Sequence, residues 1–168
     1  MMPIKRLFFI TVLLFCFSAF YTQTKDAVPI IAVDTLMAFT NKQLGIKYKY
    51  GSINPKVGFD CSGFVYYTFK HFNVSVPRAS MDYEKTGKLI SPDSSKIGDI
   101  IVFTGTNAKK RKPGHVGIVI SGMGEELRFI HSSSNTKQGG VKISTFKESP
   151  YYAKRFIKIV RLSNVMVK

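Results

Sequence analysis

The order of apolar and polar positions divides the chain into a helical part followed by a strand-rich part. Helical spacing predicts a first helix over residues 30–44, a second that begins near Cys61, and a short third over residues 80–87. Short runs rich in β-branched residues then predict five strands, over residues 99–103, 115–120, 127–131, 141–144 and 156–161. Helices first and strands later favour an α+β fold with a mainly antiparallel sheet of five to six strands.

The second predicted helix has the clearest buried face. Its apolar positions recur at helical spacing, at Phe64, Val65, Thr68, Phe69 and Phe72. Asp60 precedes this helix and is a natural N-cap, because its carboxylate can accept a bond from a free backbone N–H of the first turn. We therefore expect this helix to pack against the sheet and to present Cys61 at its N-terminal end.

The first 24 residues have the composition of a secretory signal peptide. Two basic residues precede an apolar stretch, residues 7–20, which is short for a membrane span of about 20 residues. We predict an exported protein, periplasmic, bound to the cell envelope or secreted, with one domain over residues 25–168. The bulky Phe15 before Cys16 argues against lipidation of that cysteine, because a small residue normally precedes a lipidated one.

The chain is strongly basic, with a net charge of +15. Such a charge favours attraction to anionic material, such as wall polymer or a lipid surface. Four cations are concentrated in one loop, at Lys109, Lys110, Arg111 and Lys112. This loop is either a solvated turn or a grip on an anionic wall. An exported protein seldom meets nucleic acid and no basic–aromatic motif is present, so we expect no nucleic-acid partner, and we expect a monomer.

Cys61 is the one cysteine that follows the predicted signal, so it has no disulfide partner within the domain. In the first turn of a helix, the macrodipole and free backbone N–H groups favour a thiolate. Such a thiol would react with iodoacetamide fastest at neutral pH or below. Gly63 removes bulk beside it, so that a strand or a substrate can approach. The alternative is a buried structural cysteine.

Two histidines can supply the base that a nucleophilic cysteine needs. His115 begins one predicted strand and His131 ends the next, so a hairpin would bring both to the same end of the sheet. His115 would take the thiol proton and His131 would orient it. His71 lies late in the second helix and has no such role. One cysteine and two histidines can also bind zinc, but no close-spaced ligand pair supports this, and we expect no metal or cofactor.

Six segments, in order, resemble the NlpC family of cell-wall cysteine peptidases. The segments begin at Tyr48, Phe59, Val76, Ile97, His115 and Phe129, and read YKYG, FDCSGF, VPR, IGDI, HVGI and FIHSS. The resemblance covers residues 44–161. It implies a papain-like fold and hydrolysis of peptidoglycan stem peptides, either after γ-D-glutamate or in a cross-link.

The resemblance also implies a role for each matching residue. Cys61 is then the nucleophile, His115 the base and His131 the orienting residue. Tyr48 corresponds to a tyrosine that helps position the substrate or the oxyanion, and the backbone N–H of Cys61 would be one oxyanion donor. Asp60 and Ser62 would contact the free amine of the stem peptide, although Asp60 has the N-cap role as an alternative.

The chain departs from the family pattern at three places. Ser52 replaces a second glycine, the basic loop at residues 109–112 is unusual, and the segment between the two histidines is longer than usual. Residues 122–126 can absorb the extra length as a hairpin loop. Two other functions fit the same fold: a non-catalytic wall-binding module, and a thiol amidase or acyltransferase that acts on a non-wall substrate.

Overall fold

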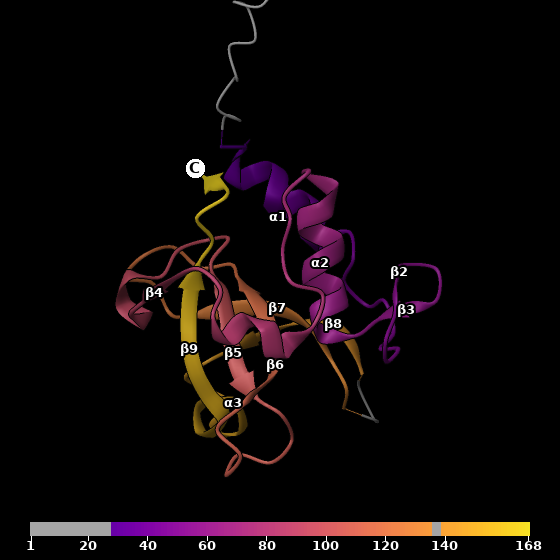
Figure 1. Ribbon diagram of the computed structural model, residues 1–168, viewed down its shortest axis with the longest axis vertical. Coiled ribbons are helices and arrows are strands. Elements are labelled where there is room, and N and C mark those ends of the chain that lie inside the picture. The colour runs from indigo at the N-terminus through magenta and orange to yellow at the C-terminus, as the bar shows by residue number, and fades with distance from the viewer. Residues whose placement is uncertain (1–27, 136–138) are drawn as a thin grey trace, which may run out of the picture.

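The computed structural model describes residues 28–135 and 139–168, and Figure 1 shows the two longer α-helices side by side, with the short third α-helix apart from them. The predicted signal peptide and Cys16 lie outside the described residues. The α-helices are α1 (Val33–Asn41), α2 (Cys61–His71) and α3 (Pro150–Arg155), and two 3-10 helices span Ser80–Glu84 and Pro92–Ser94. Among the described residues, no helix has the length and apolar character needed to cross a membrane.

Six strands form an antiparallel sheet in the order β4–β9–β5–β6–β7–β8. The strands are β4 (Lys88–Ile90), β5 (Ile100–Thr104), β6 (Pro113–Val119), β7 (Arg128–Ser133), β8 (Gly140–Thr145) and β9 (Phe156–Arg161). All five predicted strands are present, and the last one, over residues 156–161, has the predicted bounds. The α+β class and the mainly antiparallel sheet are thus confirmed. The added strand, β4, is a short edge strand.

The prediction of the first helix was wrong at its start. Ile30–Ile31 is not helical but forms β1, which pairs in parallel with β10 (Met166–Val167). The amide of Val33 then donates to the carbonyl of Lys168 over 3.0 Å, so α1 begins where this pairing ends. The partner strand is at the other end of the chain, and local spacing carries no information about it.

The third predicted helix also differs from expectation, and a small hairpin precedes Cys61. Residues 80–84 form a 3-10 helix rather than an α-helix, and the chain reaches Gly87 at φ +71°, where a helix cannot continue. Between α1 and α2, β2 (Ile53–Asn54) pairs with β3 (Gly58–Phe59). This small hairpin leads directly into α2.

The main core lies between α2 and one face of the sheet. Phe64, Val65 and Phe69 of α2 are fully buried and share one apolar cluster with Val116 and Ile130 of the central strands. Each such side chain contributes about 1.5–3 kcal/mol by leaving water. The buried face that the sequence predicted for this helix is confirmed. The packing of this face on the sheet determines where Cys61, at the start of the helix, lies relative to the strands.

A second cluster covers the opposite face of the sheet. Phe103, Phe129 and Ile159 are fully buried there together with Tyr152 of α3. The aromatic rings of this cluster lie within about 5 Å of one another, as for Phe103 and Tyr152 at 5.2 Å. The end of the sheet that carries the histidines is therefore supported from both sides.

Candidate active site

Cys61 is the first residue of α2 and faces the beginning of β6. Its side chain is 8% exposed, and Sγ lies 4.0 Å from the carbonyl oxygen of Gly114. The backbone N–H of Val116 also hydrogen-bonds the sulfur. Both contacts are with the immediate neighbours of His115, so the thiol lies against the strand segment that carries the predicted base.

The two predicted histidines meet, as the hairpin argument required. Nε2 of His115 lies 3.0 Å from Nδ1 of His131, and the two rings are nearly perpendicular at 89°. Gly117 makes room for this pair, because a Cβ at that position would lie only 3.0 Å from the Cβ of His131. The longer segment between the histidines is absorbed by a turn in which Gly122 N–H donates to the Glu125 carboxylate over 2.8 Å.

Burial raises the pKa of the Cys61 thiol above its usual value, and the nearby negative charge of Asp60 adds to this effect. The backbone N–H groups of Val116, Ser62 and Cys61 itself act in the opposite direction. The first turn of α2 therefore supplies the donors that the sequence led us to expect, but burial outweighs them. The resting side chain is a protonated thiol at neutral pH.

The histidine pair is buried and neutral. Burial lowers the pKa of His115 to about 3, and the positive charge of Arg155 contributes to the shift. Burial also lowers the pKa of His131 well below its usual value, and smaller contributions in the same direction come from His115, Lys142 and Arg155. His115 is therefore neutral, the form in which its ring can accept a proton.

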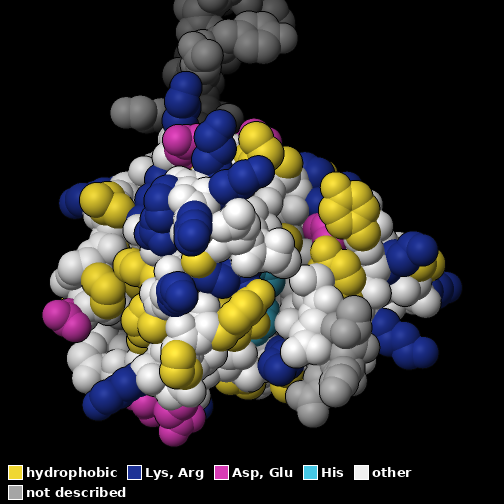
Figure 2. All heavy atoms as spheres, turned by 90° about the horizontal axis from the view of Figure 1, so that it is seen from below, with side chains coloured by type: hydrophobic (Ala, Val, Ile, Leu, Met, Phe, Trp, Pro, Cys, Tyr) yellow, Lys and Arg dark blue, Asp and Glu magenta, His cyan; other side chains and the backbone are white. Residues whose placement is uncertain are grey.

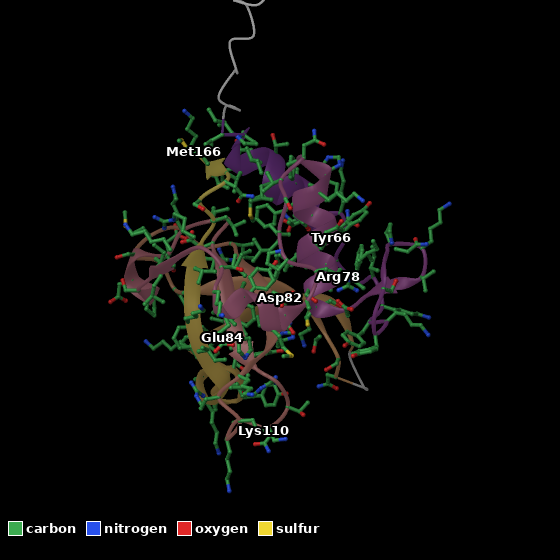
Figure 3. The ribbon with its side chains drawn as sticks, in the orientation of Figure 1. Tyr66, Arg78, Asp82, Glu84, Lys110 and Met166 are labelled. Carbon is green, nitrogen blue, oxygen red and sulfur yellow. The ribbon has the colours of Figure 1, made fainter. Side chains whose placement is uncertain are left out.

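Asp60 is held by protein donors on both carboxylate oxygens. Oδ1 accepts a hydrogen bond from the backbone N–H of Gly63 over 2.5 Å, and this bond is the predicted N-cap interaction. Arg78 donates to Oδ1 over 3.0 Å and to Oδ2 over 2.8 Å, and its guanidinium also reaches Ser62 Oγ at 3.2 Å. Figure 3 shows Arg78 beside the N-terminal end of α2. This arrangement favours the N-cap role and fixes the orientation of the first helical turn.

Tyr48 lies close to the thiol, at an isolated bridge to Phe59. Burial raises the pKa of Tyr48 to about 12, and the charges of Cys61 and Asp60 add to the shift. The phenol therefore keeps its proton across the physiological range and can serve as a hydrogen-bond donor. Gly63 makes room for a neighbouring strand segment, as one of the two expected alternatives had it: a Cβ there would collide with the carbonyl oxygen of Ser52, so the glycine lets the segment that leads into β2 approach α2.

Three residues of this site were missed from the sequence. Ser144 Oγ lies 2.9 Å from Nε2 of His131 and extends the histidine pair. Tyr152 stacks over His115, with ring centres 6.1 Å apart, and hydrogen-bonds the hydroxyls of Ser133 and Ser144. Arg78, although part of a matched segment, gave no sign of its ion pair with Asp60. None of these could be found without the register of the strands and the path of the loop after α2.

Other expected features lie away from the thiol. His71 stacks on Phe39 with ring centres 4.0 Å apart, so its role is in helix packing. In the basic loop, Arg111 donates to the backbone carbonyls of Lys154 and Phe156 and ties the loop to α3, whereas Lys110 projects from the end of the molecule opposite Met166 (Figure 3). Within residues 28–135 and 139–168, no cluster of three His, Cys, Asp or Glu side chains suits a metal ion.

The surface near the histidines is hollowed and surrounded by cations. Figure 2 shows a histidine at the bottom of a hollow, with lysine and arginine side chains distributed around it. Such a surface favours anionic ligands over cationic ones.

Comparisons with known proteins identify relatives of this arrangement. The model of the NlpC/P60 family matches residues 45–161. The chain is 30% identical over 157 residues to a gamma-DL-glutamyl hydrolase of Bacillus subtilis, covering 93% of this chain and 36% of that protein. It is 34% identical over 113 residues to the murein DD-endopeptidase MepS/murein LD-carboxypeptidase of Escherichia coli K12, covering 67% of this chain and 53% of the relative. The chain thus spans about half or less of the length of these curated relatives.

A solved structure has the same architecture. An NlpC/P60 family protein from Bacillus cereus superposes with a TM-score of 0.68 at 26% identity, over 80% of this chain and 41% of the other. This match bears out the papain-like fold that the sequence segments implied.

Proposed function

The chain belongs to the NlpC/P60 family, and we propose that it is a thiol peptidase that hydrolyses an amide bond in peptidoglycan stem peptides or their cross-links. The observation that carries this proposal is the placement of Cys61 at the head of α2, against the strand segment that presents His115, while His115 pairs with His131. In this proposal Cys61 is the nucleophile, His115 the base and His131 the group that orients the base.

The proposed reaction begins with proton transfer. His115 takes the thiol proton as the sulfur of Cys61 attacks the carbonyl carbon, and a carbon–sulfur bond forms. The oxyanion accepts hydrogen bonds from the backbone N–H of Cys61 and from the phenol of Tyr48. The raised pKa of Tyr48 keeps this phenol protonated. His115 then gives its proton to the leaving amine as the carbon–nitrogen bond breaks. Water, deprotonated by His115, hydrolyses the thioester and restores the thiol.

The acyl half of the substrate would lie along the first turn of α2. There we propose that Ser62 and Asp60 attract a free amine on the stem peptide. Asp60 already forms an ion pair with Arg78. Ser62 Oγ, which accepts a hydrogen bond from Arg78 over 3.2 Å, would therefore give the amine a second acceptor beside Asp60. The relatives are named for different bonds, a γ-glutamyl bond in one and a DD bond in the other, so both bond types are candidates for this chain.

We further propose that residues 1–24 direct export and that the basic surface holds the enzyme on an anionic wall or membrane surface. The exposed lysines Lys109, Lys110 and Lys112 support the second point, whereas Arg111 is engaged with α3. Amino-terminal sequencing of the protein recovered from envelope and medium fractions tests export: an intact first residue in the cytoplasmic fraction alone would contradict it.

Digestion of purified muropeptides tests the activity. Wild-type protein is expected to convert them to products heavier by one water in total, and the product masses identify the bond. Cys61→Ala is expected to abolish this conversion while its melting temperature stays close to that of the wild type. Full turnover by Cys61→Ala would refute the thiol mechanism, and binding without cleavage by the wild type would favour a wall-binding module instead.

A further inference from the structure

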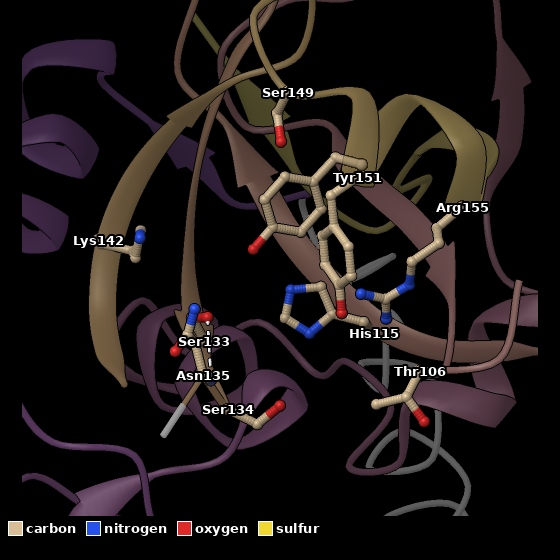
Figure 4. Close-up of a pocket in the computed structure, with 10 residues that line it drawn as sticks. Thr106, His115, Ser133, Ser134, Asn135, Lys142, Ser149, Tyr151 and Arg155 are labelled. Atoms are coloured by element: carbon tan, nitrogen blue, oxygen red, sulfur yellow. Dashed lines mark hydrogen bonds between the residues drawn. The ribbon is translucent and has the colours of Figure 1, made fainter. Parts of the chain in front are cut away.

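A cavity of about 530 Å³ opens beside His115 on the side of the molecule formed by β8 and α3. Its wall includes His115, Ser133, Lys142, Tyr151, Tyr152 and Arg155 (Figure 4). The charged side chains among its described lining residues, Lys142 and Arg155, are both cations, and none of those lining residues is acidic. The cavity is therefore built for a ligand that carries negative charge.

Arg155 is the strongest sign of such a ligand. The residue is only 6% exposed, and its Nη2 donates to the carbonyl oxygen of Thr104 over 2.7 Å. Its Nε is buried and finds no acceptor among the described residues. The guanidinium lies against the ring of Tyr151, with 4.3 Å from its central carbon to the ring centre. A ring face offers a cation some compensation but no counter-charge.

No carboxylate of the described chain neutralises Arg155. The ion pairs found in residues 28–135 and 139–168 join Arg78 to Asp60 and Arg161 to Asp99. A buried guanidinium without a counter-ion is costly, and buried charges in proteins are normally paired, so a ligand that supplies the missing charge would stabilise this one. A guanidinium presents a planar fork of donors and therefore suits a carboxylate, which can accept from two N–H groups at once.

Lys142 adds a second cation from the other wall. It belongs to β8, opposite His131 in the strand register, and it is partly buried. Figure 4 shows Lys142 and Arg155 on opposite sides of His115. A carboxylate in the cavity would thus lie in the field of two cations, near the hydroxyl groups of Ser133 and Tyr152.

The position of the cavity beside His115 indicates which half of the substrate it would bind. In the proposed reaction His115 protonates the leaving amine, so the leaving half must pass His115. The cavity has His115 in its wall, whereas Asp60 and Ser62 lie at the head of α2 on the acyl side. On the basis of the proposed function, we propose that this cavity binds a carboxylate on the leaving-amine half of the peptide substrate, through Arg155 and Lys142.

Two synthetic peptides test the proposal. They share the scissile bond and differ only in the residue that supplies the leaving amine, which carries a carboxylate in one peptide and a carboxamide in the other. Calorimetric titration of full-length Cys61→Ala, which cannot cleave them, is expected to show about tenfold tighter binding of the carboxylate peptide, the gain typical of one charge-assisted hydrogen bond. Wild-type kcat/KM is expected to show the same preference.

Variants in the Cys61→Ala background assign the preference to the cavity. Lys142→Gln is expected to reduce the ratio of the two affinities several-fold, and Arg155→Gln to bring it close to one. Lys88→Gln removes the same unit of charge from an exposed position on β4 and is expected to leave the ratio unchanged. If Arg155→Gln does not fold, the test is whether Lys142→Gln lowers the ratio of the two peptide affinities while Lys88→Gln leaves it unchanged.

Equal binding of the two peptides would overturn the proposal, as would a preference that survives Lys142→Gln and a folded Arg155→Gln. These outcomes are separate from a failure of the proposed function. If wild-type protein cleaved neither peptide nor any muropeptide, the peptidase function would fail, while the difference in affinity would still report on the cavity.

Discussion

His115 and His131 share a hydrogen bond of 3.0 Å between Nε2 of the first ring and Nδ1 of the second. Nε2 of His131 in turn lies 2.9 Å from Ser144 Oγ. If His115 donates from Nε2 to His131, its Nδ1 has a free lone pair for the thiol proton, and His131 donates from Nε2 to Ser144. In that tautomer the three residues form a chain of donors that holds His115 in the state required of a base.

Substitution of His131 tests this orienting role. His131→Ala removes the acceptor for His115 Nε2 and is expected to lower kcat about 100-fold, within the range known for loss of acid–base function. His131→Asn offers an amide oxygen in place of the ring nitrogen and is expected to retain roughly ten times more activity than His131→Ala. The measurement is kcat and KM on one muropeptide, with melting temperatures as the control. Equal loss in both variants would contradict a purely orienting role.

Ser144 is expected to act through His131 as a positioning residue. Ser144→Ala removes the acceptor at Nε2 of His131. We expect kcat to fall about three- to tenfold with little change in KM, because the substitution removes one hydrogen bond to a residue that itself only orients the base. Ser144→Thr, which keeps the hydroxyl, should restore most of the loss. The exposed Ser91→Ala is the matched control. A change in KM alone would instead place Ser144 in substrate binding.

The residues that the sequence predicted well are those whose signal is local. The buried face of α2 follows from the spacing of Phe64, Val65 and Phe69, and the N-cap from the type of residue that precedes the helix. The pairing of the histidines followed from one assumption, that the two strands form a hairpin. Each of these inferences needed only the period of a helix or the geometry of a single turn.

The features that the sequence did not reveal depend on contacts between distant segments. Ser144 reaches His131 only because β7 and β8 pair with His131 opposite Lys142, which places Ser144 two residues further along β8. Arg78 reaches Asp60 because the loop after α2 folds back to the head of the helix. The lowered thiol pKa expected at a helix end was also wrong, because a helix terminus says nothing about burial.

The raised pKa of Cys61 changes what alkylation should show. A protonated, 8% exposed thiol is expected to react with iodoacetamide more slowly than a peptide thiol at pH 7, and the rate is expected to rise about tenfold per pH unit from pH 7 to 9. Peptide mapping by mass spectrometry measures the rate at Cys61 separately from Cys16. His115→Asn should show the same slope. A plateau that extends below pH 7 and disappears in His115→Asn would reveal a thiolate–imidazolium pair in the resting protein.

The buried histidine pair predicts how folding stability depends on pH. The pKa of His115 is lowered to about 3 by burial, against about 6.5 for an unfolded chain. Between these values the unfolded chain binds more protons, so the free energy of unfolding rises with pH. The stability that the neutral ring contributes is fully present above about pH 6.5 and is lost progressively as the pH falls toward 3.

From pH 7.5 to pH 5, linkage predicts a loss of roughly 2 kcal/mol per buried neutral histidine. Urea unfolding of Cys61→Ala at the two pH values measures this difference without turnover. His131→Asn in that background removes one titrating ring and should reduce the difference by about 2 kcal/mol, whatever its effect at pH 7.5. His71→Asn is the matched control, because it removes an exposed histidine that lies apart from the buried pair. A free energy of unfolding that stayed constant from pH 7.5 to 5 would mean that the native pair takes up protons as the unfolded chain does, which would contradict a buried neutral pair.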